Sequence, residues 1–267
     1  MSDQEGADWI PPGADLSRPS AARIYDYLLG GAHNLAPDRA VAQQLQAIQP
    51  QVASVARRNR AFLRRAVRFL LEQGVRQFLD LGSGIPTVGN VHEVAQAVDP
   101  GARVVYVDYE PVAVAHSRML LKDNPNAAAL EADATDVEGV LASAEVTRLL
   151  DLRRPVGLLA ITLGHYLPGV RGVFAGYRAA LVPGSYLALT HLTNDFAVLS
   201  DPRVAETMRG TQDHIHPRTR DEVLALFEGF ELVEPGLTTS ANWRPDRLAA
   251  VVDPEEDGLY AGVGAKR

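Results

Sequence analysis

The sequence contains no cysteine and has no excess of positive charge. The absence of cysteine from the 267 residues excludes disulfide bonds, thiolate zinc sites and a cysteine nucleophile. Acidic residues outnumber basic ones by 33 to 26, for a formal net charge of -7, so there is no overall basic field to hold a polyanion. Nucleic acid is therefore not the expected partner.

Long apolar runs are also missing. No stretch approaches the roughly 20 uncharged apolar residues that cross a bilayer. The first six residues, MSDQEG, are acidic and lack the apolar core of a secretory signal. We therefore expect a cytoplasmic protein with no membrane partner. The composition, 46% hydrophobic and 22% charged, is that of a globular protein large enough for one α/β domain with additional helices.

Two segments precede the first predicted strand. Residues 1–19 are rich in Pro, Gly and Asp without periodicity, which predicts a loose arm on the surface. Residues 20–49 carry short, interrupted helical patterns. We expect residues 1–55 to form an arm and a helical lid that packs on a main domain of residues 56–267.

From residue 56 onward the chain alternates between helical and strand patterns. The repeated order of strand, helix and strand predicts parallel pairing with right-handed crossovers, as in a doubly wound, Rossmann-like α/β sheet. An amphipathic helix over residues 56–72 precedes this alternation. Strands are predicted at residues 77–81, 103–107, 128–131, 156–163, 185–192, 230–234 and 259–265.

A glycine turn follows the first predicted strand. It reads Asp80, Leu81, Gly82, Ser83 and Gly84. Glycines at such a turn let the backbone approach a ligand closely and adopt angles that other residues avoid. For this motif alone, a tight turn without a ligand is the alternative.

Two further acidic residues follow the turn at nearly equal spacing. Asp108 lies 26 positions after Gly82, and Asp133 lies 25 positions after Asp108, each at the end of a predicted strand. A carboxylate at the first position can accept hydrogen bonds from both ribose hydroxyls of an adenosine group. One at the second position can meet the exocyclic amine of adenine. Together with Asp80, these residues indicate an adenosine site.

NAD is the alternative ligand for such a site. The dinucleotide fingerprint has a third glycine where this chain has Thr87, and Pro86 removes an amide donor from the turn. An amino-acid carboxylate next to a sulfonium needs fewer backbone amides than a pyrophosphate does. The turn therefore favours S-adenosylmethionine, and an NAD-dependent oxidoreductase is the less favoured alternative.

Several segments of the sequence resemble motifs of known enzymes. Residues 78–84 (FLDLGSG), 107–111 (VDYEP) and 132–134 (ADA) resemble motifs I, II and III of class I S-adenosylmethionine-dependent methyltransferases. Residues 18–31 (RPSAARIYDYLLGG) and 59–62 (NRAF) are similar to an actinobacterial S-adenosyl methyltransferase family of unassigned substrate. This second likeness covers nearly the whole chain.

The resemblance implies a fold, a cofactor and a set of binding residues. The fold would be a seven-stranded, mostly parallel sheet with an antiparallel last strand, and the cofactor S-adenosylmethionine. Gly82 and Gly84 would line the methionine portion, Asp108 the ribose, and Asp133 and Ala134 the adenine. The other candidate cofactor-binding residues are Asp80, Ser83, Tyr109, Thr162, Arg60 and Tyr25.

The predicted lid carries some of these candidates. Arg60 can pair with the cofactor carboxylate, and Tyr25, Tyr27 and His33 can line a lid. An equally weighted alternative is that the aromatic residues belong to the core and that Arg60 is a solvated arginine on the surface of a helix.

Methyl transfer depends largely on positioning and desolvation, so a catalytic dyad is not required. In the resembled class, the loop after the fourth strand meets the acceptor, and here it is residues 162–168, TLGHYLP. We predict His165 as a general base and Tyr166 as a residue that shapes the site, with a structural hydrogen bond as the alternative for His165. The loop lacks the Asn-Pro-Pro-Tyr signature of amino-group methylation on bases or glutamine.

Three histidines suggest a metal site at first sight. His214 and His216 are close in sequence and His191 could join them, but no nearby acids accompany them in a fixed geometry, so we predict no metal. The sequence thus predicts an S-adenosylmethionine-dependent methyltransferase that acts on a small-molecule acceptor. A cofactor-binding sensor or docking module without catalysis is the non-enzymatic alternative.

Overall fold

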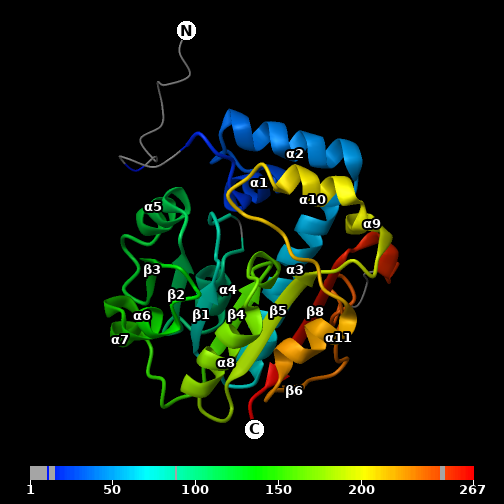
Figure 1. Ribbon diagram of the computed structural model, residues 1–267. Helices are drawn as coiled ribbons and strands as arrows, with labels where there is room; N and C mark the ends of the chain where they lie inside the picture. The colour runs from blue at the N-terminus through cyan, green and yellow to red at the C-terminus, as the bar shows by residue number, and fades with distance from the viewer. Residues whose placement is uncertain (1–10, 12–15, 88, 247–249) are drawn as a thin grey trace.

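The computed structural model describes residue 11 and residues 16–87, 89–246 and 250–267. Most of the predicted N-terminal arm, residues 1–10 and 12–15, lies outside the described residues. The rest of the chain forms a central sheet with helices on both faces, and further helices lie across one end of the sheet (Figure 1). No helix in the described ranges combines the length and the apolar character needed to span a membrane.

The sheet has the predicted Rossmann-like organisation. Its strands follow the order β3-β2-β1-β4-β5-β8-β6, with the short β7 paired to β8. The first five strands pair in parallel, and β8 runs antiparallel between β5 and β6. The strands are β1 (Gln77–Leu81), β2 (Arg103–Asp108), β3 (Ala127–Glu131), β4 (Gly157–Ile161), β5 (Tyr186–Leu192), β6 (Glu231–Leu232), β7 (Thr238–Thr239) and β8 (Leu259–Ala265).

The strand order creates a crevice next to β1. From β1 the chain continues to β2 and β3, which lie on one side of β1 within the sheet, and then returns to β4, which pairs with the other edge of β1. Every residue of β1 and β4 is buried, as expected for central strands that are covered on both faces. Ligands of open α/β sheets bind where the strand order reverses, outside the carboxyl ends of the strands. The fold therefore predicts a site beyond β1 and β4.

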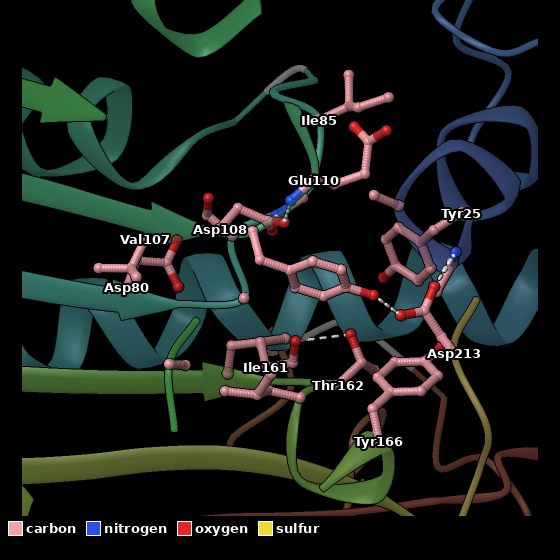
Figure 2. A pocket seen from close by; sticks show the side chains of 18 of the residues that line it. Tyr25, Asp80, Ile85, Val107, Asp108, Glu110, Ile161, Thr162, Tyr166 and Asp213 are labelled. Carbon is pink, nitrogen blue, oxygen red and sulfur yellow. Dashed lines mark hydrogen bonds between the residues drawn. The ribbon is translucent and has the colours of Figure 1, made fainter. Parts of the chain in front are cut away.

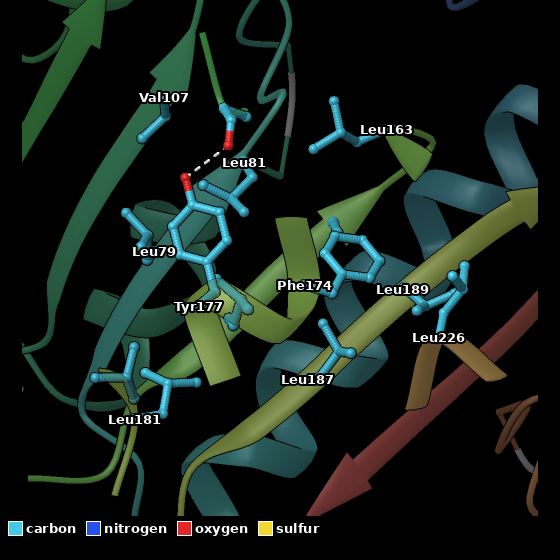
Figure 3. Close-up of a cluster of buried hydrophobic side chains, with 14 of the residues drawn as sticks. Leu79, Leu81, Val107, Leu163, Phe174, Tyr177, Leu181, Leu187, Leu189 and Leu226 are labelled. Carbon is cyan, nitrogen blue, oxygen red and sulfur yellow. Dashed lines mark hydrogen bonds between the residues drawn. The ribbon is translucent and has the colours of Figure 1, made fainter. Parts of the chain in front are cut away.

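Helices cover both faces of the sheet. The longest, α3, runs without a break from Val52 to Glu72 and packs on one face with α4. On the other face, Phe174 and Tyr177 of α8 pack among leucines of β1 and β5 (Figure 3). The helices of the main body are α3 (Val52–Glu72), α4 (Val91–Val98), α5 (Pro111–Leu120), α6 (Val137–Ala142), α7 (Ala144–Leu149), α8 (Val170–Ala180) and α11 (Arg220–Leu224).

Four further helices gather at the end of the sheet. They are α1 (Ala21–Leu28), α2 (Ala36–Ile48), α9 (Ala197–Ser200) and α10 (Pro202–Met208). The first two come from the predicted lid segment, whereas α10 comes from the chain after β5 (Figure 1). Ile24, Leu28 and Leu45 form a separate apolar cluster with Val204 and Met208 of α10. The helices thus have their own core above the sheet.

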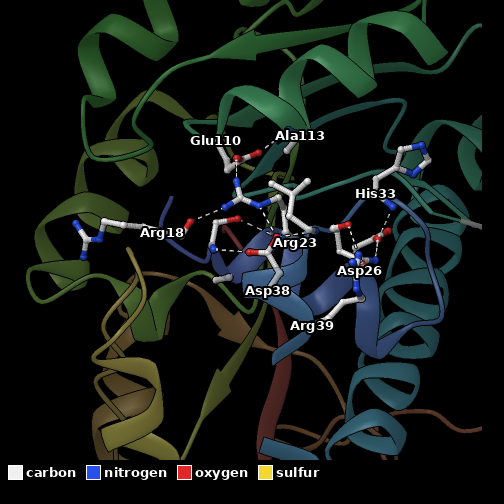
Figure 4. Close-up of polar contacts among 12 residues, drawn as sticks. Arg18, Arg23, Asp26, His33, Asp38, Arg39, Glu110 and Ala113 are labelled. Carbon is white, nitrogen blue, oxygen red and sulfur yellow. Dashed lines mark hydrogen bonds and ion pairs between the residues drawn. The ribbon is translucent and has the colours of Figure 1, made fainter. Parts of the chain in front are cut away.

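A buried ionic network attaches these helices to the sheet. Arg23 of α1, whose side chain is 1% exposed, donates to Asp38 of α2 over 2.8 Å and also to Glu110 at the start of α5 (Figure 4). Glu110 in turn accepts a hydrogen bond from the Ala113 amide. Removing one member of a buried charge network leaves its partner uncompensated, at a cost of about 3 to 5 kcal/mol. The network therefore fixes α1 relative to β2.

Candidate active site

A pocket of about 260 Å³ lies beyond the carboxyl ends of β1 to β4, under α1 (Figure 2). It is the site that the strand order predicts. All the predicted site residues except His165 line it. They are Tyr25, Arg60, Asp80, Gly82, Ser83, Gly84, Asp108, Tyr109, Asp133, Ala134, Thr162 and Tyr166.

The glycine turn after β1 forms the floor of the pocket. Gly82 and Gly84 have φ angles of 63° and 65°, in the left-handed region that favours glycine. A Cβ atom on Gly82 would lie 2.7 Å from the Leu163 side chain, whereas one on Gly84 would meet no atom within 4 Å. Gly82 is therefore required by packing, and Gly84 keeps open the space into which a side chain would project.

Asp108 is fixed at the end of β2 by two backbone amides. Its two carboxylate oxygens accept from Gly84, over 2.7 Å, and from Glu110, over 2.9 Å. Burial raises the pKa of Asp108 to about 6, although these amides act in the opposite direction. A carboxylate has about four acceptor sites, so Asp108 can accept further hydrogen bonds from a ligand in the pocket.

A second group of polar side chains surrounds the end of β1. Burial raises the pKa of Asp80 to about 7, and Asp108 adds to this effect while Arg60 opposes it. The neighbouring Asn59 donates to the Tyr25 hydroxyl over 2.8 Å. In the described structure, Oδ1 of Asn59 and Nε of Arg60 are buried without a hydrogen-bond partner. Such atoms cost about 1 to 3 kcal/mol each, and both residues line the pocket.

The segment after β3 forms the far wall of the pocket. Asp133 accepts from the Thr135 amide over 2.8 Å, and the carbonyl of Ala134 accepts from the Tyr177 hydroxyl over 2.9 Å (Figure 3). Tyr177 lies in the apolar layer beneath the sheet. The position of Ala134 therefore depends on the core as well as on the turn.

Comparison with known proteins agrees with this geometry. The sequence model of the S-adenosyl methyltransferase family matches residues 7–267. This chain belongs to the S-adenosyl methyltransferase family. A Thermobifida fusca protein assigned as a methyltransferase is 44% identical, with a TM-score of 0.91 over 98% of this chain and 100% of its own. A DUF574 family protein from Streptomyces avermitilis is 37% identical, with a TM-score of 0.90 over 95% of this chain and 99% of its own.

Membership of the family confirms the predicted enzyme class and its cofactor, S-adenosylmethionine. Neither the NAD-dependent oxidoreductase nor the non-catalytic binding module is favoured. No curated protein matches the chain in the same kind of comparison.

The pocket of the methyltransferase is covered by a roof that joins α1, part of the predicted lid segment, to the loop after α10, which was not predicted there. Asp213, in the loop after α10, accepts from the Tyr109 hydroxyl and from the Ala21 amide at the start of α1, the latter over 2.7 Å (Figure 2). Two contacts beside it join residues 18–19 to residues 211–212. The roof therefore consists of α1 and the loop after α10, held together at Asp213.

Tyr25 and Tyr166 line the pocket beneath this roof. The Tyr25 hydroxyl donates to the Ala56 carbonyl over 3.0 Å. Burial, and then the nearby Asp213 carboxylate, raise the pKa of the Tyr166 phenol. The two other residues expected in a lid are elsewhere: Tyr27 contacts Gln43, and His33 stacks on His116 with 3.7 Å between ring centroids.

His165, predicted as the general base, does not line this pocket. It belongs to the short 3-10 turn η1 (Gly164–Tyr166), which directs Tyr166 into the pocket and His165 toward β5. Its side chain is 4% exposed, and Nδ1 accepts from the Leu192 amide over 3.3 Å. Burial, assisted by His191, lowers its pKa well below the usual range. The imidazole thus contacts the backbone of β5 rather than the pocket beyond β1 to β4.

The other histidines do not converge on one point. His191 Nε2 faces the Arg218 guanidinium at 2.8 Å, and its Nδ1 lies 2.7 Å from the Leu192 carbonyl. His214 lines the pocket beyond β1 to β4, whereas the His216 amide donates to the backbone of His165. Within the described ranges, no three His, Cys, Asp or Glu side chains are grouped so that they could hold a metal ion.

Proposed function

We propose that the methyltransferase holds S-adenosylmethionine in the pocket beyond β1 to β4 and methylates a small-molecule acceptor that binds beneath α1. One observation carries the proposal. Asp80, Asp108, Gly84, Asn59 and Arg60 all border a single pocket, and Asn59 and Arg60 each carry one buried polar atom without a partner in the described structure. This donor and acceptor set matches an adenosyl group at one end and an amino acid at the other.

Asp108 is the residue that we assign to the ribose. Both of its oxygens are already oriented by backbone amides, so the carboxylate needs little rearrangement to accept two further hydroxyl donors. Asp133 and Ala134 are assigned to the adenine, which would lie against the segment after β3. Tyr109 flanks the same part of the pocket.

The group around β1 is assigned to the amino-acid end. The Arg60 guanidinium would pair with the carboxylate, and the Asp80 carboxylate and Asn59 Oδ1 would accept from the ammonium. Of these groups, Asn59 Oδ1 and the Nε of Arg60 are buried without a partner in the described structure. Gly84 leaves the space that the chain between the two ends requires.

When bound, S-adenosylmethionine supplies an electrophilic methyl group: a lone pair of the acceptor bonds to the methyl carbon while the C–S bond breaks and its electron pair remains on sulfur. The roof excludes water from this reaction and holds the acceptor in line. Asp213 contacts Tyr109 at the roof, and its carboxylate helps to raise the pKa of Tyr166. We assign its carboxylate as the group that receives the acceptor's proton.

Labelled methyl transfer tests the proposal. The methyltransferase is incubated with an actinobacterial cell extract and S-adenosylmethionine that carries a labelled methyl group. We expect label in the acid-soluble, small-molecule fraction, and much less there with the Asp108→Ala variant at the same cofactor concentration. Label confined to precipitated protein or nucleic acid would contradict the small-molecule acceptor. Calorimetry that detects no binding of S-adenosylhomocysteine, the demethylated product, would contradict the cofactor site itself.

A further inference from the structure

A second cavity adjoins the cofactor pocket, between α1, α2, α3 and α10. Its volume is about 110 Å³. The walls are largely apolar, and Gln49 and His165 are the polar side chains that they contain away from the cofactor pocket. The apolar side chains of the wall include Ile24, Leu28, Leu45, Val55, Val204 and Met208.

The two cavities share part of their walls. Ala21, Tyr25, Thr162 and Tyr166 line both. These residues come from α1 and from the loop after β4, so the boundary lies directly beneath the roof. A molecule in the second cavity would therefore lie next to the first pocket, with Tyr25, Thr162 and Tyr166 at the boundary.

The backbone is strained at this boundary. Thr162 has a φ angle of 57°, although β-branched residues strongly avoid the left-handed region. Its amide donates to Thr190 over 2.9 Å, and its hydroxyl donates to the Ile161 carbonyl over 2.6 Å. Strain of this kind costs about 1 to 3 kcal/mol and is typical of ligand-contacting positions. Thr162 is therefore held at the boundary at the expense of stability.

The size and polarity of the cavity limit what can occupy it. An apolar cavity of roughly 150 Å³ is large enough to bind benzene, so about 110 Å³ holds one ring or a short branched chain after minor side-chain adjustment. Charged groups or several hydroxyls would lose hydrogen bonds to water without replacement in these walls. Sugars, nucleotides and free amino acids are thus poor occupants.

We infer that this second cavity, here named the acceptor cavity, binds the apolar body of the methyl acceptor. The acceptor is then a compact aromatic or branched aliphatic molecule with its nucleophilic oxygen or nitrogen at one end. Its apolar part contacts Leu45 and Val204, and its nucleophile lies at the boundary beside Tyr25 and Tyr166. This inference rests on the proposed function, since it takes the methyl donor to be in the first pocket.

A brominated phenol tests the location directly. Crystals of the full chain with S-adenosylhomocysteine are soaked with 4-bromophenol, and the bromine is located by its anomalous scattering. We expect bromine among Leu28, Leu45 and Val204, with the phenol oxygen toward Tyr25 and Tyr166. A bromine found only outside the acceptor cavity, or no bound bromophenol at saturation, overturns the inference.

A cavity-filling variant provides a second measurement. Val204→Phe places a ring in the acceptor cavity, and Val98→Phe, at a position on α4 that is 60% exposed, makes the same change at the surface. With S-adenosylhomocysteine present, we expect Val204→Phe to weaken 4-bromophenol binding at least tenfold in calorimetry, and Val98→Phe to leave it within twofold of the wild type. Equal binding by Val204→Phe and wild type overturns the inference.

The proposed function and the acceptor cavity can be overturned separately. If the wild type binds S-adenosylhomocysteine but no 4-bromophenol enters the acceptor cavity, only the acceptor cavity is wrong. If S-adenosylhomocysteine itself does not bind, the proposed function is wrong. Should Val204→Phe not fold, the bromine position in the wild-type crystal decides the matter.

Discussion

The Tyr109 hydroxyl donates a hydrogen bond to Asp213, which joins the rim of the cofactor pocket to the loop after α10. The other carboxylate oxygen of Asp213 accepts from the amide of Ala21. One side chain therefore connects three separate segments over the pocket. Because hydrogen bonds to a charged group each contribute about 1.5 to 3 kcal/mol, these contacts are strong enough to control how readily the roof opens.

Asp213→Ala should therefore accelerate ligand release. We expect S-adenosylhomocysteine to dissociate at least tenfold faster in surface plasmon resonance. A loss of roughly 1.4 kcal/mol from the free energy that keeps the roof closed corresponds to a factor of ten in the rate. Glu206→Ala, an exposed acid on the adjoining α10, is the matched control and should leave the rate unchanged. An unaltered dissociation rate in Asp213→Ala would show that Asp213 does not hold the roof closed.

Asp108→Ala should remove the hydrogen bonds that we assign to the ribose. We expect the Kd for adenosine and for S-adenosylhomocysteine to rise by about a hundredfold in calorimetry, or roughly 2.7 kcal/mol. Glu131→Ala changes another acid at the end of a strand, but one that does not line the pocket, and should have little effect. Equal losses in the two variants would contradict a specific role for Asp108.

Arg60→Met should affect only the amino-acid end of the ligand. Because the guanidinium is assigned to the cofactor carboxylate, we expect S-adenosylhomocysteine to bind at least tenfold more weakly while adenosine binds as before. Arg57→Met, one helical turn earlier and exposed, is the matched control. A comparable loss of adenosine affinity would mean that Arg60 supports the pocket as a whole.

Binding of S-adenosylhomocysteine should strengthen as the pH rises from 6.5 to 8. The pKa of Asp80 is raised to about 7 in the unliganded protein, so the carboxyl is mostly protonated at the lower pH. The ligand's ammonium favours ionised Asp80, and proton linkage then predicts an affinity about fourfold higher at pH 8. Asp108, with a pKa of about 6, contributes little in this range. Titrations at both pH values should lose this difference in Asp80→Asn, and a persisting difference would rule out Asp80 as its source.

Gly84→Ala should separate backbone strain from blockage of the pocket. Gly84 and Gly74 both have left-handed φ angles, and a Cβ atom meets no neighbour within 4 Å at either position. We expect each alanine variant to lose about 1 kcal/mol of unfolding free energy in urea denaturation. Only Gly84→Ala should also weaken cofactor binding, since its methyl group enters the pocket. Equal ligand affinity in the two variants would contradict the position proposed for the cofactor.

The site residues that lie at the ends of strands could be predicted from the sequence. Asp80, Asp108 and Asp133 each come at or just after the end of a parallel strand, and the carboxyl ends of such strands share one edge of the sheet. Local periodicity defines the strands, so these residues could be brought together without coordinates. The two-residue strand β7 is too short to show any period, and it was not predicted.

The contribution of the loop after α10 to the roof and the direction of side chains in the loop after β4 could not be predicted in this way. Asp213 meets Tyr109 only because α10 folds back over α1 and α2, a contact between residues 104 positions apart that no local pattern marks. His165 and Tyr166 are neighbours in the same 3-10 turn, and both line the acceptor cavity, but only Tyr166 also lines the first pocket. Asn59 lies next to a predicted residue, yet its unpartnered oxygen is evident only in three dimensions.

The ionic contacts of Arg23 limit how the enzyme can be altered. Deleting α1 and α2 would uncover the pocket, but it would also remove Arg23, the cationic partner of Glu110 at the start of α5. Shortened forms of the chain are therefore expected to misfold rather than to accept bulkier compounds. Widening the range of acceptors calls for trimming individual side chains from within, with the N-terminal helices left intact.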